Sequence, residues 1–517
     1  PIPLRSHRPG GGVSRIGRVT PRAWRWDWIG PGLVALVALV LRLWRLGYPN
    51  LLVFDETYYA KDAYSLTQHG YAQDFVKAAN KRIEAGHLDH LMTGQPSQIV
   101  HPDGGKWLIA IGEHLFGMNS FGWRVSAAVV GALTVLVLAR LVLRLTHSVW
   151  IACLAGVLLC FDGLHFVMSR VALLDVFLAF WVVCAVACLV ADRDWIRARL
   201  DRYRMLRPWQ LAAGACFGMA MGTKWSGLWL LAVFGLASVL WELSARRTLR
   251  PAALLKVAGP AFLSIVGVGL VVYLLTWTGW LLHADLYAQR FGRGYGDDKA
   301  WGQYVVSPTG GPFGGILDAF RSLWHYHVMT YRFHTGAFLE SQTHPYQSSP
   351  WGWLVLERPV AFDAHNDLPA ALCGAPAGSS CMREITALGN PAVWWGGTLA
   401  ALVAVGAWIR TRDGRWAVPV LGALAAWLPW FQYEGRPIFQ FYAVVAVPFL
   451  VVATCLVVDA LRRRARTPRS RYAVGLLTGV YAVLAVSLFW YFYPILTDRL
   501  ISYDDWYARM WFGKHWI

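Results

Sequence analysis

The sequence predicts an all-α polytopic membrane protein, and three observations lead to that fold class. Hydrophobic residues make up 56% of the 517 positions, the chain holds 29 Trp, and the mean hydropathy is +0.40. Apolar segments long enough to cross a bilayer recur along the chain. Basic residues concentrate in alternate connections between these segments. Soluble domains do not combine these three features.

Eleven apolar segments are expected to form the membrane-spanning helices. They comprise residues 28–46, 121–143, 149–168, 173–191, 209–222, 227–243, 254–278, 391–409, 416–430, 442–460 and 472–493. An odd number of crossings places the two termini on opposite sides of the membrane. The first segment is too long for a signal-peptide core and lacks an Ala-x-Ala exit, so an uncleaved anchor is expected.

Arg and Lys gather on one side of this arrangement. They fill the arm from Arg5 to Arg25 and the connections Arg193–Arg207, Arg246–Lys256 and Arg462–Arg471. The positive-inside rule then places the N-terminus in the cytoplasm and the C-terminal tail outside the plasma membrane. The net charge of +18 is therefore explained by topology, and no nucleic-acid partner is expected.

Five regions follow from these boundaries. Residues 1–27 form a flexible basic arm that can touch anionic membrane lipids. Residues 28–278 contain spans one to seven and an outer loop at 47–106, and residues 391–493 contain spans eight to eleven. The large outer loop at 279–390 has few periodic runs, which predicts a loop structure on the membrane face. Residues 494–517 form an outer tail.

Two adjacent carboxylates, Asp55 and Glu56, follow the first span on the outer side. Neighbouring acids repel each other and are costly to desolvate, so such a pair at a membrane boundary suggests proton or cation handling. The alternative is structural, because Asp55 could cap a helix over Thr57–Tyr64. Local sequence alone gives the two interpretations equal weight.

Basic side chains also lie on the outer face, at Arg124, Arg170, Lys224 and Arg436. Arg170 and Asp175 stand in an otherwise apolar stretch, where they could form a structural ion pair or, for Arg170, a phosphate fork. His101 and Lys106 flank a Gly-rich turn that could contact an anion, although an ordinary turn is the simpler interpretation.

The 279–390 loop carries four histidines among aromatic residues: His325, His327, His334 and His344. No pair of them has a zinc spacing with an acid partner, so a divalent metal is left open but is not indicated, and no cofactor is assigned. An aromatic and polar lining for a sugar or peptide is favoured. In the same loop, Cys373 and Cys381 would pair in an oxidising compartment.

An acid pair beside scattered cations suits group transfer from a phosphate-linked donor. The bases would neutralise the leaving phosphate, and a carboxylate would accept a proton from the attacking hydroxyl. Because the cytoplasmic connections are short and contain no phosphate loop, the donor is expected to be linked to a lipid and to enter from the bilayer.

The chain resembles the protein O-mannosyltransferases of the GT-C glycosyltransferase fold, in their actinobacterial form. The matching motifs, in order, are Phe54-Asp55-Glu56-Thr57-Tyr58-Tyr59, His101-Pro102 with Lys106, Trp123-Arg124, Arg170 with Leu173-Leu174-Asp175, Lys224-Trp225, and Leu388-Gly389-Asn390-Pro391 with Trp394-Trp395. The β-trefoil insert of the eukaryotic enzymes is missing from the 279–390 loop, which leaves acceptor selection open.

The resemblance implies a GT-C bundle of about eleven transmembrane helices that transfers mannose, with inversion, from polyprenyl-phosphate-mannose to Ser or Thr of unfolded secreted polypeptides. Asp55 would be the general base and Glu56 would position a substrate. The cationic pocket would draw on Arg124, Arg170, Lys224, Arg436, His101 and Lys106, with Asp175 in a structural or orienting role. The secretion translocon is a further candidate partner. The alternatives are a GT-C enzyme with a lipid or glycan acceptor, a lipid-linked sugar transporter, and a structural partner of the translocon.

Overall fold

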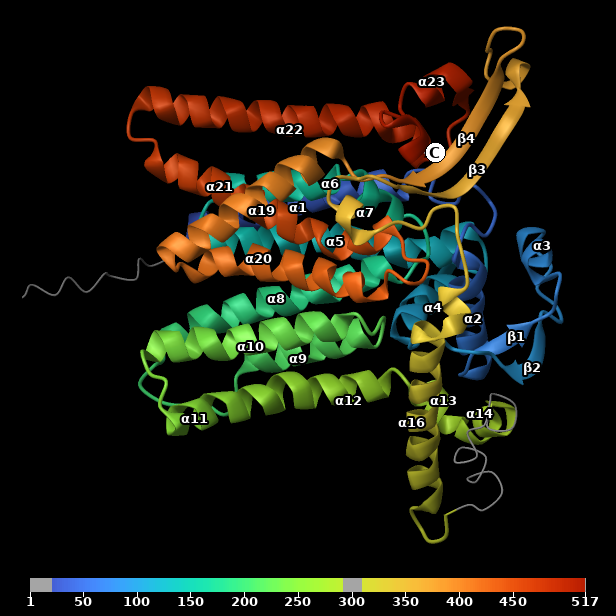
Figure 1. Cartoon of the computed structure of the whole chain (residues 1–517), viewed down its shortest axis with the longest axis horizontal. Coiled ribbons are helices and arrows are strands. Elements are labelled where there is room, and N and C mark those ends of the chain that lie inside the picture. Colours follow the sequence, from blue (N-terminus) through green and yellow to red (C-terminus); the bar gives the residue numbers. More distant parts are fainter. Residues whose placement is uncertain (1–20, 292–308, 517) are drawn as a thin grey trace, which may run out of the picture.

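The computed structural model describes residues 21–291 and 309–516, so most of the basic arm at 1–27 lies outside the described residues. Figure 1 shows long helices running side by side in one bundle. One end of the bundle carries short helices and two small sheets. The connections α8–α9, α10–α11, α19–α20 and α21–α22 lie together at the opposite end, which agrees with the predicted alternation of basic connections.

The amino-terminal part of the bundle follows the predicted apolar segments closely. Its helices are α1 (Pro21–Leu43), α5 (Ser120–Thr146), α6 (Val149–Cys160), α7 (Gly163–Met168), α8 (Asp175–Arg197), α9 (Pro208–Met221), α10 (Gly227–Arg246), α11 (Pro251–Phe262) and α12 (Val268–Leu275). The π-helical turn η1 (Leu263–Gly267) joins α11 to α12. Asn119 caps α5 by accepting hydrogen bonds from the backbone N–H groups of Phe121 and Gly122, a common start for a helix.

The carboxy-terminal part adds four long helices. They are α19 (Pro391–Thr411), α20 (Gly414–Trp427), α21 (Val447–Arg464) and α22 (Pro468–Leu496), with the 3-10 turns η3 (Leu428–Tyr433) and η4 (Gln440–Val445) between α20 and α21. Burial differs strongly among the helices. In α8, 72% of the most apolar window is buried inside the protein, whereas in α22 only 17% is. Helix α8 is therefore central, and α22 presents its surface to lipid.

A helix occupies each of the eleven predicted apolar ranges, which identifies a multi-pass membrane protein. Within the described ranges, six helices are long and apolar enough to cross a bilayer alone: α5, α8, α10, α11–α12, α19 and α22. Others are shorter, such as the 14-residue α9 and α20. The number of eleven crossings therefore stays a prediction.

The first outer loop folds against the end of the bundle. It contains α2 (Glu56–His69), β1 (Gln73–Phe75), α3 (Ala79–Glu84), β2 (Met92–Pro96) and the amphipathic helix α4 (Gly104–Phe116). Strands β1 and β2 pair antiparallel, with Gln73 opposite Pro96. The prediction of an all-α chain was thus wrong in detail, because two small sheets cover this end.

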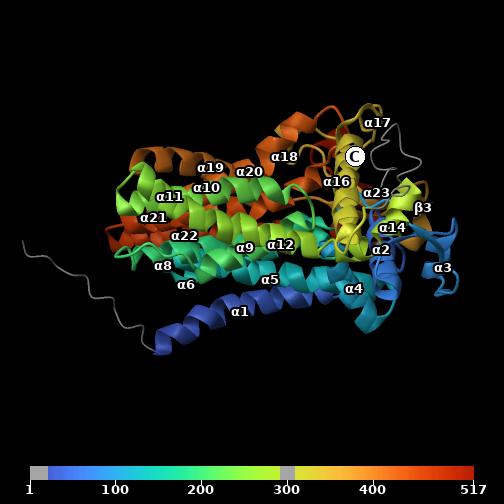
Figure 2. The same ribbon diagram turned by 90° about the horizontal axis from the view of Figure 1, so that it is seen from below.

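The 279–390 region is more regular than predicted. It holds α13 (Thr278–Leu282), α14 (Ala284–Phe291), α16 (Gly314–Thr335), α17 (Ala337–Glu340), α18 (Pro350–Trp353), β3 (Val360–Pro369), η2 (Ala370–Leu372) and β4 (Ser380–Ala387). The 22-residue α16 contradicts the expectation of few periodic runs. Figures 1 and 2 both show α16 running across the direction of the bundle helices. Its aromatic residues and histidines masked the helical period, because its inner face packs on other aromatic rings.

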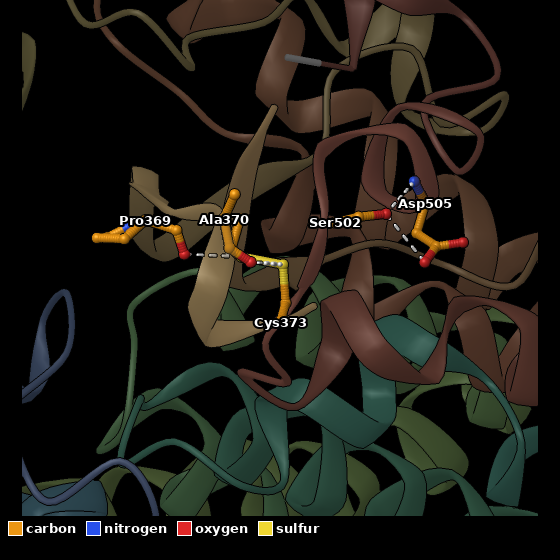
Figure 3. The surroundings of a disulfide bond; sticks show 6 residues. Pro369, Ala370, Cys373, Ser502 and Asp505 are labelled. Atoms are coloured by element: carbon orange, nitrogen blue, oxygen red, sulfur yellow. Dashed lines mark hydrogen bonds between the residues drawn. A yellow bond between two sulfur atoms is a disulfide. The ribbon is translucent and has the colours of Figure 1, made fainter. Parts of the chain in front are cut away.

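The predicted pairing of Cys373 with Cys381 is confirmed. The disulfide closes the turn between β3 and β4, with 6.0 Å between the two Cα atoms (Figure 3). Strand β4 also pairs with β5 (Ile501–Ser502), so the C-terminal segment joins this sheet. The Ser502 hydroxyl then caps α23 (Tyr503–Tyr507) by accepting from the backbone N–H of Asp505, as Figure 3 shows.

Candidate active site

Asp55 stands at the point where α2 begins. It occupies the N-cap position, as the structural alternative predicted, but its side chain makes no capping hydrogen bond. The preceding Phe54 has a φ of 47°, so the chain turns sharply before the helix. Because the carboxylate does not bond the helix N–H groups, it is free to face the surroundings described below.

Glu56 belongs to a closed network. Its side chain is fully buried and binds Arg124 with two contacts of 2.8 Å, from Nε to Oε1 and from Nη2 to Oε2. The carboxylate also accepts from the backbone N–H of Val53, at 3.0 Å, and of Ala172, at 2.9 Å. Four hydrogen bonds hold this carboxylate, so the geometry makes Glu56 an anchor for the start of α2 and not a group that contacts substrate.

Arg124 was assigned to the phosphate pocket, and the structure contradicts that assignment. The side chain is 1% exposed. Its two contacts to Glu56 are joined by three bonds to the carbonyls of Leu46, Pro49 and Leu51. A guanidinium has five N–H groups, and all five are used here. Arg124 therefore ties α5 to the turn that carries Asp55, and no N–H remains for a phosphate.

Asp55 lies among groups that oppose one another electrostatically. Burial raises the pKa of its carboxyl, Lys224 lowers it, Asp175 raises it again, and hydrogen bonding to Tyr59 lowers it. The result is a pKa of about 6, against 3.8 for the ordinary group. Within the described ranges, Asp55 takes part in no ion pair. A partly buried carboxylate with a pKa near neutrality suits a general base.

Lys224 and Asp175 form a tight ion pair beside Asp55. The Lys224 Nζ lies 2.7 and 2.9 Å from the two Asp175 carboxylate oxygens, and 5.0 Å from the ring centre of Tyr442. Asp175, for which a structural or orienting role was predicted, holds Lys224 in this position. The suggested ion pair between Arg170 and Asp175 is wrong, because Asp175 at the start of α8 faces the α9–α10 turn instead.

Arg170 does not join this cluster. Its Nη1 donates at 2.7 Å to the carbonyls of Arg42 and Trp44, at the end of α1. These carbonyls are left without partners where the helix ends, so the guanidinium satisfies them. The assignment of Arg170 to the donor-phosphate pocket is corrected accordingly.

Lys106 was also predicted to contribute to the phosphate pocket, but its ammonium group is bound by two carboxylates. The buried Nζ contacts Asp62 at 2.9 Å and Asp103 at 3.0 Å. Burial lowers the pKa of Lys106, but the two carboxylates outweigh burial and raise it. With two acids on one ammonium, this trio carries a net negative charge and would repel a phosphate.

His101 and Arg436 remain close to Lys224. Burial lowers the pKa of His101 well below its ordinary value, and Lys224, His334, Lys106 and Arg436 lower it further, so the imidazole is neutral at pH 7. The rings of His101 and His334 stack with centroids 5.7 Å apart. The buried Nε of Arg436 has no hydrogen-bond partner among the described residues. Arg436 therefore keeps donors for an anion.

Three site residues were not predicted as such. Tyr59 and Tyr442 lie near Asp55, since the charge of Asp55 acts on both hydroxyls and the Tyr59 hydroxyl hydrogen-bonds to the Asp55 carboxylate. His334 was considered only as a metal ligand or sugar contact. The spacing from Asp55 to Tyr59, one helical turn, could have indicated Tyr59. No local pattern marks Tyr442 or His334, which come from distant parts of the chain.

The histidines of the 279–390 region do not converge. His334 lies against His101, whereas His327 stacks on Trp225 with ring centroids 5.3 Å apart. Across the described ranges, no three His, Cys, Asp or Glu side chains gather as they would around a metal ion. A divalent metal therefore stays open and is not indicated, as in the sequence analysis.

A pocket beside the site opens among α8, α10, α20 and η4. Its walls include Asp175, Ser226, Trp229, Trp430 and Tyr442. Trp229 and Trp430 pack edge to face with centroids 5.5 Å apart. The enclosed space is only about 10 Å³, roughly the room that one water molecule needs, so these indole rings close one side of the Lys224–Asp175 ion pair.

A multi-pass helical bundle with a carboxylate and cations clustered at one end defines a membrane glycosyltransferase of the GT-C type. The fold agrees with a chain of the Saccharomyces cerevisiae protein O-mannosyltransferase Pmt1–Pmt2 complex bound to the sugar donor, at a TM-score of 0.67 and 15% identity, covering 91% of this chain and 90% of that one. The Archaeoglobus fulgidus oligosaccharyltransferase in its apo form shares the fold at a TM-score of 0.53 and 14% identity, over 90% of this chain and 56% of its own.

The chain belongs to the polyprenol-phosphate-mannose–protein mannosyltransferase family. The Mycobacterium tuberculosis protein of that name is 34% identical, over 94% of this chain and 91% of its own length, and the Mycolicibacterium smegmatis protein is 33% identical, over 94% and 92%. Residues 32–287 match the dolichyl-phosphate-mannose-protein mannosyltransferase family. Residues 319–516 match the C-terminal four-transmembrane region of protein O-mannosyltransferases.

Proposed function

We propose that this enzyme transfers mannose from polyprenyl-phosphate-mannose to Ser or Thr hydroxyls of exported polypeptides, on the outer face of the plasma membrane. The observation that carries the mechanism is the surroundings of Asp55: a carboxyl with a pKa of about 6, next to a lysine held by Asp175. The family relationship supports the donor and the acceptor class.

In this mechanism Asp55 accepts the proton of the acceptor hydroxyl as its oxygen attacks the anomeric carbon of mannose. The bond from that carbon to the phosphate oxygen breaks, and polyprenyl phosphate leaves with the electron pair. Attack opposite the leaving group inverts the anomeric configuration. Lys224 and Arg436 neutralise the phosphate as its charge grows, and the neutral His101 offers a hydrogen bond.

The remaining residues hold this arrangement in place. Glu56 and Arg124 fix the turn before α2, so that Asp55 keeps its position. Asp175 fixes Lys224. The donor places its phosphate at Lys224 and Arg436 and its sugar toward Asp55. The basic connections at the other end of the bundle support a cytoplasmic location for that end.

The test is a transfer assay in membranes, with labelled polyprenyl-phosphate-mannose and a Thr-, Ser- and Pro-rich peptide. Wild type should label the peptide and Asp55→Asn should not. The matched control is Asp89→Asn, which removes an exposed carboxylate from the same outer loop and should retain activity. Label appearing on lipid instead of peptide would refute the acceptor class. Peptide labelling by Asp55→Asn at the wild-type rate would remove Asp55 from the mechanism.

A further inference from the structure

A second pocket lies at the same end of the bundle, between the ends of α1 and α22. It encloses about 500 Å³ and shares no lining residue with the pocket beside Asp55. Three of its residues are arginines, Arg45, Arg170 and Arg499, and its side toward the membrane includes Trp44 and Trp490. The mechanism proposed above uses none of these five residues.

The three arginines lack acidic partners. In the part of the chain that the structure describes, none of them takes part in an ion pair, and no Asp or Glu lines the pocket. The neighbouring acid Asp498 is buried and pairs with Arg383 instead. Like charges brought together in one pocket repel each other, so an anion in the pocket would be bound favourably.

Arg170 lies at the base of the pocket and is held in place by its hydrogen bonds. Its side chain is 8% exposed, and its hydrogen bonds to the carbonyls of Arg42, Trp44 and Arg45 hold the turn that follows α1. The hydrogen bond from Arg170 to the Arg45 carbonyl thereby fixes the backbone position of Arg45. Arg45 and Arg499 are exposed and make no side-chain hydrogen bond among the described residues, so their N–H groups are free to bind.

The apolar side of the pocket marks its depth in the membrane. Trp44 is 64% exposed, Trp490 is 49% exposed and Val40 is 58% exposed, all at the ends of helices on the outer side. Tryptophans gather at the level of lipid headgroups, with apolar side chains below them toward the acyl chains. The arginines therefore stand at phosphate height, and the groove beneath them accepts hydrocarbon.

We infer that this pocket binds one anionic glycerophospholipid of the outer leaflet, with its phosphate between Arg45 and Arg499 above Arg170 and an acyl chain along Trp44 and Trp490. Arginine suits this role because its planar fork matches phosphate oxygens. The bound lipid would join the end of α22, the least buried of the six candidate spans in the described ranges, to the end of α1.

The experiment compares wild type with the double variant R45Q/R499Q, purified and placed in phosphatidylcholine nanodiscs. Native mass spectrometry measures how much protein retains one phosphatidylglycerol when this lipid is titrated in. The matched control is R410Q/R469Q, which removes two exposed arginines that form no ion pair among the described residues, from the opposite end of the bundle. Arg170 stays intact in both, so that the turn after α1 is preserved. Thermal unfolding without phosphatidylglycerol verifies that both variants fold.

Wild type and R410Q/R469Q should bind one phosphatidylglycerol with equal affinity, and R45Q/R499Q should bind it at least about tenfold more weakly, as expected for two lost charge-assisted bonds. Equal retention by all three proteins would overturn the inference. Further arms use polyprenyl phosphate and inorganic phosphate. The phospholipid assignment would be refuted if R45Q/R499Q lost binding of polyprenyl phosphate but not of phosphatidylglycerol. It would also be refuted if inorganic phosphate fully displaced phosphatidylglycerol from the wild type. The measurement does not depend on mannose transfer.

Discussion

Asp55 and Glu56 are adjacent in the sequence and have opposite surroundings. Glu56 has four hydrogen bonds, two of them from a bidentate arginine, and it is fully buried. Asp55 makes no capping bond and no ion pair within the described ranges, and its pKa is raised to about 6. Of these two neighbouring acids, the fully hydrogen-bonded Glu56 holds the turn before α2, and we propose that Asp55 reacts. The predictions below test that division.

The largest expected effect separates activity from stability. Asp55→Asn should lower transfer by ~10²–10⁴-fold, the usual contribution of a general base. Its melting temperature should stay near the wild-type value, because no ion pair is broken. Initial rates and thermal unfolding of the same preparation measure both. A marked fall in melting temperature would mean that Asp55 is structural, like its neighbour.

Arg124→Gln should do the reverse and weaken the fold. It leaves the Glu56 carboxylate buried without its cation, which costs about 3–5 kcal/mol of unfolding free energy. Thermal unfolding in detergent, or the yield of monodisperse protein, reports this loss. The double variant E56Q/R124Q removes both charges and should lose less than the sum of the two single variants. Strict additivity would show that the two side chains do not act as a pair.

The pH dependence should follow Asp55. The base must be ionised, and its pKa is about 6, so kcat/KM should be constant above pH 7 and fall as the pH drops through 6. In Lys224→Gln the acidic limb should move to higher pH, because Lys224 lowers the Asp55 pKa. Since folding raises this pKa, Asp55 favours the folded state at low pH, and that contribution is lost as the pH rises through 6. An unchanged limb in Lys224→Gln would separate Lys224 from Asp55.

The smallest effect on transfer is expected far from both acids. Cys381→Ser opens the short loop that the disulfide closes, where the separation is eight residues. A loop of this size corresponds to about 2.5 kcal/mol in the chain-entropy description, felt mainly within the β3–β4 hairpin. Limited proteolysis should cleave the hairpin faster, and the transfer rate should change by less than about twofold. A large loss of transfer would place the hairpin in acceptor binding.

The motifs that carry the family resemblance also fall into two kinds, residues that hold the fold together and residues that face the site. Asn390 donates to the carbonyls of Phe161 and Ala485, and Trp394 donates to Asp162, so this motif joins α19 to α7 and α22. Lys224 and Asp55 face the site. Both kinds of residue can mark a family, because a fixed architecture and a fixed chemistry each constrain the sequence.

The sequence by itself determined the mostly helical membrane fold, the positions of the apolar bundle helices, the disulfide and the family. These follow from signals carried by neighbouring residues, such as apolar runs of bilayer length, alternating charge and ordered short motifs. Asp55 could be singled out because it follows the first span. The helix α16 escaped detection because aromatic packing hides its period.

Only the tertiary structure decided which charge meets which. Four single bases near the outer face have four different partners. Arg124 binds a carboxylate and three carbonyls, and Arg170 caps the end of α1. Lys106 binds two acids, and Lys224 lies beside Asp55. An ionic contact acts over a few ångströms and gains strength with burial. Both quantities depend on how distant segments pack, which no local stretch of sequence contains.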